Sequence, residues 1–234
     1  MITHTPAEPQ RGGSRQSDLC PRAGRMPGVS QIITIHPENP QKRYVDQAVD
    51  IIRAGGLLVY PTDSSYAFGC EIGNKKALDR IRLLRQADKL HDFSLVVRDL
   101  SEIATYARVD NWAYRLLKHF TPGPYTFILK ATREVPNRLK NPRKKTIGIR
   151  VPDHPISQAL LEALGEPMMS STLLLPGDDV PMTDPVEIAG RLGNQVDAVV
   201  DGGAGGMEPS SVLDLTEGTV HILRRGIGDV SAFE

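Results

Sequence analysis

Cysteine is scarce in this chain of 234 residues, which has only Cys20 and Cys70. Two cysteines cannot build a disulfide framework or a cysteine-rich zinc site, so the sequence predicts a reduced, cytoplasmic setting. Net charge is also missing, because 28 basic residues balance 28 acidic ones. A global electrostatic attraction to nucleic acid or to a membrane is therefore excluded, and such a partner would need a local patch.

Long apolar runs are absent as well, and the longest one is far too short to span a membrane. The first 30 residues contain proline, glycine, serine and several arginines, but they lack the apolar segment of a signal peptide. This composition predicts a disordered tail over residues 1–30. An alternative is that translation starts at Met26, and the mass of the intact native protein would distinguish the two.

The remaining composition is that of an ordinary globular protein. Hydrophobic residues make up 40% and charged residues 24% of the chain, which excludes a wholly disordered or fibrous protein. A chain of this length can bury a sizeable core in one α/β domain. We therefore expect a single domain over residues 31–234, and we find no internal repeat.

Apolar spacing and capping signals predict where helices and strands lie. The expected helices cover residues 45–54, 74–84, 111–120 and 155–164, with a further one starting at Asp184. The expected strands cover residues 56–60, 94–98, 125–129, 146–151, 196–200, 211–215 and 219–223. Helices alternate with strands early in the chain, and the last two strands form a hairpin through Glu217-Gly218. This order predicts a twisted, mixed parallel and antiparallel sheet with flanking helices.

Several well-known catalytic motifs are missing. The chain has no phosphate loop of the Gly-x-x-x-x-Gly-Lys type, no Gly-x-Ser-x-Gly turn and no His-Glu-x-x-His helix. The glycines at 202, 203, 205 and 206 do not match a dinucleotide motif, because Glu208 stands at the third glycine position and Pro209 follows it. We expect a flexible loop there. The six histidines lack the spacing of metal ligands, so we assign no metal site.

The segment Pro61 to Gly69 is rich in polar residues and directly follows a buried strand. Ligands in α/β proteins bind at the carboxyl ends of strands, and hydroxyl groups at such a place can hold a small polar molecule. An ordinary turn would have a similar composition, so the segment alone does not decide the matter.

Arg150 stands inside the apolar strand Thr146 to Val151. A buried charge is costly unless it is paired, so Arg150 either forms a structural ion pair or binds a ligand. A ligand carboxylate held by its guanidinium would contribute about 1.5–3 kcal/mol. Both alternatives stay open at this point.

These segments, taken in order, resemble the YrdC-like threonylcarbamoyl-adenylate synthase family. The resemblance covers about residues 32–234 and rests on five motifs, which are the loop 61–69, the turn 121–124, and the segments 146–155, 209–214 and 223–226. Further details are similar to the YciO subgroup, namely the segments 93–95, 98–100, 161–167 and 175–177.

The resemblance implies a YrdC-like fold with a large, basic, concave cavity. It implies condensation of L-threonine, bicarbonate and ATP to L-threonylcarbamoyl-adenylate and pyrophosphate, for the t6A modification of tRNA. ATP would act as a substrate together with Mg²⁺, with no tightly bound cofactor. A carbamate must reach the α-phosphate as pyrophosphate leaves, so cationic groups should stabilise the developing charge. The protein would work as a monomer or a homodimer.

The resemblance also assigns roles to individual residues. Thr62, Tyr66 and Arg150 match the positions that bind threonine. The nucleotide would be bound by Arg85, Thr172, Ser210 and Arg224. Among these, Arg85 and Thr172 match the catalytic signatures Lys-x-Arg and Ser-x-Asn of the family.

Two signature groups are replaced in this chain. The signature lysine falls on Leu83 and the signature asparagine falls on Leu174. Loss of one preorganised donor commonly costs about 100- to 1000-fold in rate, so we expect weak or altered synthase activity. The alternative is a non-catalytic paralogue that binds RNA or a nucleotide.

A basic segment precedes the strand of Arg150. Residues 138–150 contain no acidic side chain, and their cations before Arg150 are Arg138, Lys140, Arg143, Lys144 and Lys145. Most runs of this kind are solvated surfaces. Binding of double-stranded RNA or tRNA through phosphate contacts is the functional alternative, and the resemblance favours it.

Overall fold

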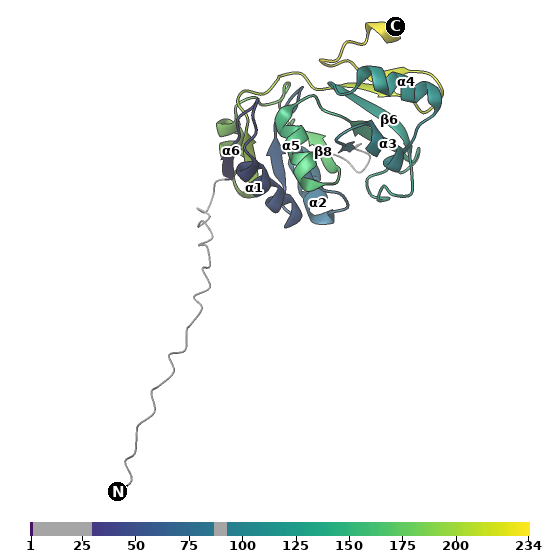
Figure 1. Cartoon of the computed structure of the whole chain (residues 1–234). Coiled ribbons are helices and arrows are strands. Elements are labelled where there is room, and N and C mark those ends of the chain that lie inside the picture. Colours follow the sequence, from purple (N-terminus) through teal and green to yellow (C-terminus); the bar gives the residue numbers. More distant parts are fainter. Residues whose placement is uncertain (2–29, 87–92) are drawn as a thin grey trace.

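The computed structural model describes Met1 and residues 30–86 and 93–234 (Figure 1). The predicted tail, residues 1–30, falls almost wholly outside this range. The described residues form six α-helices, which are α1 (Lys42–Arg53), α2 (Lys75–Arg85), α3 (Leu100–Tyr106), α4 (Asn111–Phe120), α5 (Pro155–Leu164) and α6 (Pro185–Leu192).

The strands form one mixed sheet. They are β1 (Gln31–Thr34), β2 (Leu58–Tyr60), β3 (Ala67–Glu71), β4 (Ser94–Val96), β5 (Ala107–Arg108), β6 (Tyr125–Ala131), β7 (Thr146–Arg150), β8 (Met168–Thr172), β9 (Ala198–Asp201), β10 (Ser211–Asp214) and β11 (His221–Arg224). Their order across the sheet is β1-β9-β2-β3-β8-β4-β7-β6-β10-β11, and β5 pairs with β6. The sheet contains parallel pairs, such as β4–β7, and antiparallel pairs, such as β3–β8.

Local sequence signals set several helix ends. The Asn74 side chain accepts a hydrogen bond from the Ala77 amide at 3.1 Å and begins α2. Asp184 accepts from the Val186 and Glu187 amides at 2.7 and 3.1 Å and begins α6. Gly165, with φ of +76°, ends α5, because glycine tolerates the left-handed conformation.

Two predicted details of local structure are wrong. Residues 67–69 belong to strand β3 rather than to the polar loop, which therefore ends at Tyr66. The sequence also predicts that Asp110 caps the helix 111–120; Asp110 is the residue before α4, but its side chain makes no capping bond with a described residue. The strands β1, β3, β5 and β8 and helix α3 were not predicted. The four strands show no clear apolar alternation in the sequence. Helix α3 does carry Leu100, Ile103 and Ala104 at helical spacing after its Asp99 cap, and this signal was missed.

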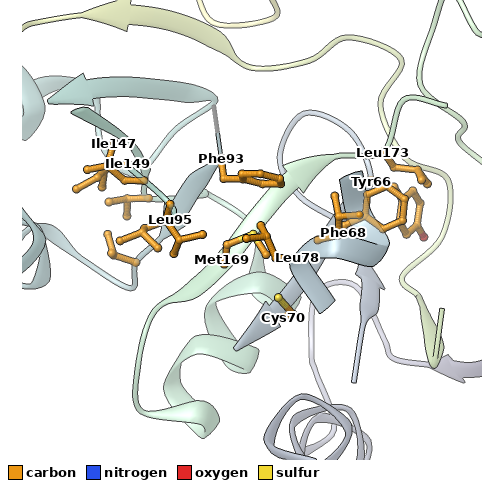
Figure 2. Packing of buried hydrophobic residues seen from close by; sticks show 14 of the residues in the cluster. Tyr66, Phe68, Cys70, Leu78, Phe93, Leu95, Ile147, Ile149, Met169 and Leu173 are labelled. Atoms are coloured by element: carbon orange, nitrogen blue, oxygen red, sulfur yellow. The ribbon is translucent and has the colours of Figure 1, made fainter. Parts of the chain in front are cut away.

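The helices cover the two faces of the sheet differently. Helices α1 and α5 pack on one face through residues such as Val49, Ile52 and Leu160. Helices α2, α3, α4 and α6 contribute to the larger cluster on the other face, and Figure 2 shows part of it, including Phe68, Leu78 and Met169. The cluster under α1 and α5 draws on β1, β9, β2, β3, β8 and one residue of β4, and includes none from β7, β6, β10 or β11.

The sheet therefore keeps a face over β4, β7, β6, β10 and β11 that α1 and α5 do not bury. Within the described residues, no helix is long and apolar enough to cross a lipid bilayer.

Candidate functional site

A pocket of about 340 Å³ lies on this uncovered part of the sheet. Ligand pockets of small molecules usually measure about 300–1,000 Å³. The lining contains three arginines, six hydroxyl side chains and several aliphatic ones, which are Arg85, Arg150, Arg224, Ser94, Thr126, Ser170, Ser171, Thr172, Ser210, Ala67, Val96, Ile128, Val212 and Leu223. We call it the arginine pocket.

Strand register explains why these residues meet. Val212 of β10 pairs with both Thr126 of β6 and Arg224 of β11. Phe127 pairs with Ile149, which places Arg150 beside Thr126 in the same row. Arg150 and Arg224 are thus three strands apart in the sheet, so their backbones are separated by about 14 Å. Their long side chains approach each other from the two sides of the pocket.

Small residues form the floor of the pocket. Ser94 pairs with Ser170 of β8 on one side and with Gly148 of β7 on the other. A Cβ atom on Gly148 would lie 2.7 Å from the Ser94 hydroxyl oxygen and 3.2 Å from the Thr126 methyl carbon. A larger residue at position 148 would therefore fill space that the pocket now uses.

Arg150 is 7% exposed and forms an ion pair with Asp63. Its Nη2 also donates to the Thr62 hydroxyl at 3.2 Å and to the Ser64 hydroxyl at 2.9 Å. Its Nε is buried and has no hydrogen-bond partner among the described residues. Of the two alternatives for this charge, the ion pair is therefore present, and a donor remains for a ligand.

Arg224 and Arg85 bring further positive charge. Arg224 donates to the Ser210 carbonyl from Nε at 3.0 Å and from Nη2 at 2.8 Å. Arg85 reaches the pocket from the last turn of α2, and its Nη1 donates to the Ser171 hydroxyl at 2.5 Å. Burial, and after it the positive charge of Arg224, lower the pKa of Arg85 to about 10.

The pKa of Arg224 is lowered too, by burial first and then by the charge of Arg150. Arg224 therefore lies close enough to Arg85 and to Arg150 for their positive charges to repel. An anionic ligand placed between them would relieve this repulsion, so the arrangement is suited to binding anions.

The structure brings together five of the predicted ligand residues and separates two. Arg85, Arg150, Thr172, Ser210 and Arg224 all line the pocket. Thr62 and Tyr66 do not.

Thr62 lies behind Arg150, accepts one of its hydrogen bonds and donates to the Ser65 carbonyl at 2.6 Å. Tyr66 packs in the cluster on the other face of the sheet, and its hydroxyl donates to the Gly203 carbonyl at 2.7 Å.

The two replaced signature positions lie outside the pocket lining. Leu83 is 78% exposed on α2, and Leu174 is half-buried in the segment after β8. Leu83 is two residues before Arg85, so a longer polar side chain at position 83 would start from the same helical turn as Arg85.

The predicted basic patch lies in the loop between β6 and β7. Arg143, Lys144 and Lys145 are exposed. Lys144 lies 3.7 Å from the Asp214 carboxylate, and Arg138 donates to the Gly73 carbonyl at 2.9 Å. Lys140 is half-buried. Part of the charge of this patch is therefore already used within the protein.

Sequence reasoning missed Asp63, Ser94, Thr126, Ser170 and Gly148 as parts of the site. Asp63 was inside the predicted loop but was not recognised as the partner of Arg150. The others share one signal, because each is a small polar residue or glycine within a strand, where a core position usually holds a large apolar residue. Within residues 30–86 and 93–234, no group of three or more His, Cys, Asp or Glu side chains could hold a metal ion.

Comparisons with known proteins identify the family and the fold. Residues 50–226 match the model of the Sua5/YciO/YrdC family, which is described as "telomere recombination". The uncharacterized protein YciO of Escherichia coli K12 is 56% identical over 205 residues, which cover 88% of this chain and 100% of that protein. The crystal structure of E. coli YciO superposes with a TM-score of 0.85 at the same coverage.

Two more distant relatives have informative names. The threonylcarbamoyl-AMP synthase of Vibrio cholerae is 28% identical over 186 residues, which cover 78% of this chain and 97% of that protein. Sua5 of P. abyssi, crystallised in complex with L-threonine, is 25% identical with a TM-score of 0.75, and the match covers 84% of this chain and 58% of that one. The predicted mixed sheet with flanking helices is confirmed, and the chain belongs to the Sua5/YciO/YrdC family.

Proposed function

We propose that the arginine pocket binds L-threonine and ATP and that the protein slowly condenses them with bicarbonate to threonylcarbamoyl-adenylate. One observation carries this proposal, namely that Arg85, Arg150 and Arg224 reach a single pocket from α2, β7 and β11. A ligand with a carboxylate at one end and phosphates at the other fits such a distribution of charge. Like charges repel, so three arginines from distant segments in one pocket lower stability unless an anion binds between them.

The carboxylate end is assigned to Arg150. Its buried Nε can donate to a carboxylate oxygen, while Asp63, Thr62 and Ser64 hold Nη2 from behind. L-threonine is chosen as the ligand because Sua5 of P. abyssi, which is 25% identical to this chain, has been crystallised with it.

The phosphate end is assigned to Arg85 and Arg224. The amine of L-threonine combines with bicarbonate to give a carbamate and water. A carbamate oxygen then attacks the α-phosphorus of ATP, and the bond to the leaving pyrophosphate breaks. Negative charge grows on the transferred phosphorus oxygens and on the leaving group, where the two guanidinium groups stabilise it. Thr172 and Ser210 supply hydroxyl groups at the pocket wall. Mg²⁺ would enter with the phosphates of its substrate.

The rate is expected to be low because of Leu83 and Leu174. Restoring the family residues with Leu83→Lys and Leu174→Asn should increase pyrophosphate release that depends on both ATP and L-threonine. Since Leu83 is exposed, Leu83→Lys should fold without loss of stability. An unchanged rate in the double variant would contradict this explanation of weak activity.

Ligand binding is tested by thermal stability. A ligand that binds the native state raises stability by about 2.7 kcal/mol at a hundred times its dissociation constant. We expect ATP to raise the melting temperature and L-threonine to raise it further. Stabilisation by L-threonine with none by ATP would reject adenylate formation.

A second candidate function is binding of double-stranded RNA or tRNA without catalysis. The exposed cations Arg143, Lys144 and Lys145 support it, as do the two replaced signature residues. Phosphate-driven binding must weaken steeply as salt rises, because counterions are released. A dissociation constant that does not depend on salt would exclude this mode.

A further inference from the structure

The loop between β9 and β10 begins with the sequence Gly202-Gly203-Ala204-Gly205-Gly206 and lies against the loop of Thr62 and Ser64. We call residues 202–206 the glycine loop. A Cβ atom on Gly206 would lie 1.8 Å from the Ser64 carbonyl oxygen, and one on Gly205 would lie 2.5 Å from Cδ2 of Tyr66. The backbones approach so closely that no side chain fits between them, which only glycine allows.

Hydrogen bonds hold the glycine loop in this place. The Tyr66 hydroxyl donates to the Gly203 carbonyl at 2.7 Å and accepts from the Gly202 amide at 3.3 Å. The Gly205 amide donates to the Thr183 carbonyl at 2.9 Å. Burial raises the pKa of Tyr66 to about 12, so its hydroxyl keeps its proton and remains a donor at neutral pH.

The loop that it contacts holds Arg150. Ser64 and Thr62 accept from Nη2 of Arg150, and Asp63 neutralises its charge. Gly206 therefore contacts the carbonyl of the same residue whose hydroxyl orients the guanidinium. A side chain at position 206 would have no space and would displace Ser64. Because the Ser64 hydroxyl holds the Arg150 guanidinium, Arg150 would move with it.

We propose that the glycine loop positions Arg150, with Gly206 as its principal positioning residue. The loop fixes Ser64, Ser64 and its neighbours fix Nη2, and the Arg150 guanidinium is thereby held in the pocket lining. The inference deepens the proposed function and rests on it for the identity of the ligand. The orientation of Arg150 can be measured without any ligand, so the positioning role of the glycine loop and the proposed function can be refuted separately.

The chain offers a matched control for Gly206→Ala. Gly203 belongs to the same loop and has a φ of +90°, but a Cβ atom there meets nothing within 4 Å. Gly203→Ala therefore strains the backbone of the same loop, while the added methyl group contacts none of residues 61–66. Tyr66→Phe serves as a second test variant, since it removes the two bonds to the glycine loop without adding an atom.

The ligand-free test follows the Nε–H resonance of Arg150 by NMR, assigned through its loss in Arg150→Lys. We expect this resonance to shift or broaden in Gly206→Ala and in Tyr66→Phe, and to keep its position in Gly203→Ala. An unchanged resonance in the folded Gly206→Ala protein would overturn the proposal. If that variant does not fold, an unchanged resonance in Tyr66→Phe overturns it instead.

The ligand test compares L-threonine with pyrophosphate by calorimetry. We expect Gly206→Ala to weaken L-threonine binding at least tenfold and to change pyrophosphate binding less than twofold. A merely structural role would lower the folded fraction and weaken both alike, and that result would refute the positioning role. If the wild-type protein binds no L-threonine, the proposed function fails, and the Arg150 resonance alone decides the role of Gly206.

Discussion

The buried pair of Asp63 and Arg150 gives the sharpest test of how the site is built. We expect Asp63→Asn to lower the free energy of unfolding. The substitution keeps the shape of the side chain but leaves the buried charge of Arg150 without its partner. Both side chains are less than 10% exposed, at 8% for Arg150 and 9% for Asp63. An uncompensated buried charge usually costs about 3–5 kcal/mol.

The lower end of this range applies here. The Asp63 carboxylate accepts from Arg150 through Oδ1 and from the Asp153 amide through Oδ2 at 2.9 Å. Asparagine has one acceptor oxygen, so it can keep one of these bonds and must lose the other. We expect a loss of about 3 kcal/mol in the free energy of unfolding.

Urea denaturation measures this loss directly. The chain has a single tryptophan, Trp112, which packs against the core and reports unfolding by fluorescence. With a denaturant slope of about 2 kcal/mol per molar, the midpoint should fall by about 1.5 M. A carboxylate at Arg150 should restore part of the stability, so L-threonine should stabilise the variant more than the wild type.

Asp46→Asn is the matched control. Asp46 pairs with Lys42 one turn away on α1, and their side chains are 46% and 86% exposed. Such surface pairs contribute about 0.5 kcal/mol or less. If Asp63→Asn lowered the midpoint no more than Asp46→Asn, Arg150 would not depend on Asp63 and our account of the buried charge would be wrong.

Three further predictions concern the pocket and its surroundings. Replacing Arg224 by Gln should weaken pyrophosphate binding by about 10- to 100-fold in calorimetry, because one charge-assisted contact is lost, and an unchanged affinity would remove Arg224 from the phosphate site. Gly148→Ala should cost about 1 kcal/mol and weaken ATP binding, since its Cβ would lie 2.7 Å from the Ser94 hydroxyl. The added change Ser94→Ala should restore part of the stability and part of the ATP affinity. No recovery of either would argue against a contact between position 148 and Ser94. Burial lowers the pKa of His154 below its usual 6.5, so the unfolded chain binds more protons, and stability should fall as pH drops through that value. His154→Gln should flatten this dependence in urea titrations, and an equal slope in both proteins would contradict it.

The sequence predicted best those parts whose cause is local. The starts of α2 and α6 follow from the side chains of Asn74 and Asp184, which bond to amides two or three residues away. The end of α5 follows from Gly165. These signals act within one turn of helix, so they can be read without knowing the rest of the fold.

Strand β8 shows why other parts could not be predicted. Its sequence, Met168-Met169-Ser170-Ser171-Thr172, has neither an apolar run nor an alternation of apolar and polar residues. Its serines are small because the pocket lies above them, and the strand is held by its neighbours β3 and β4. A functional site thus removed the pattern that would have revealed the strand.

Asp63 shows the same limit for the site. Arg150 could be singled out because a charge within an apolar strand needs a partner. Its partner lies 87 residues away in the sequence, and nothing local distinguishes Asp63 from the other polar residues of its loop. Which acid pairs with which base is decided by the order of strands, which the composition of each strand does not contain.

The incomplete cover of the sheet explains why the pocket lies where it does. Where α1 and α5 pack, the sheet presents apolar residues such as Tyr60 and Met168. On the uncovered strands the same face presents Ser94, Thr126, Arg150 and Arg224, and Arg85 reaches the pocket from α2. The lowered pKa of Arg85 means that its charged form is less stable in the fold than in water, so this charge costs stability in the ligand-free protein. Small residues and an unfavourable charge at this part of the sheet do not add to the hydrophobic core. Binding an anion is the property that these residues can supply.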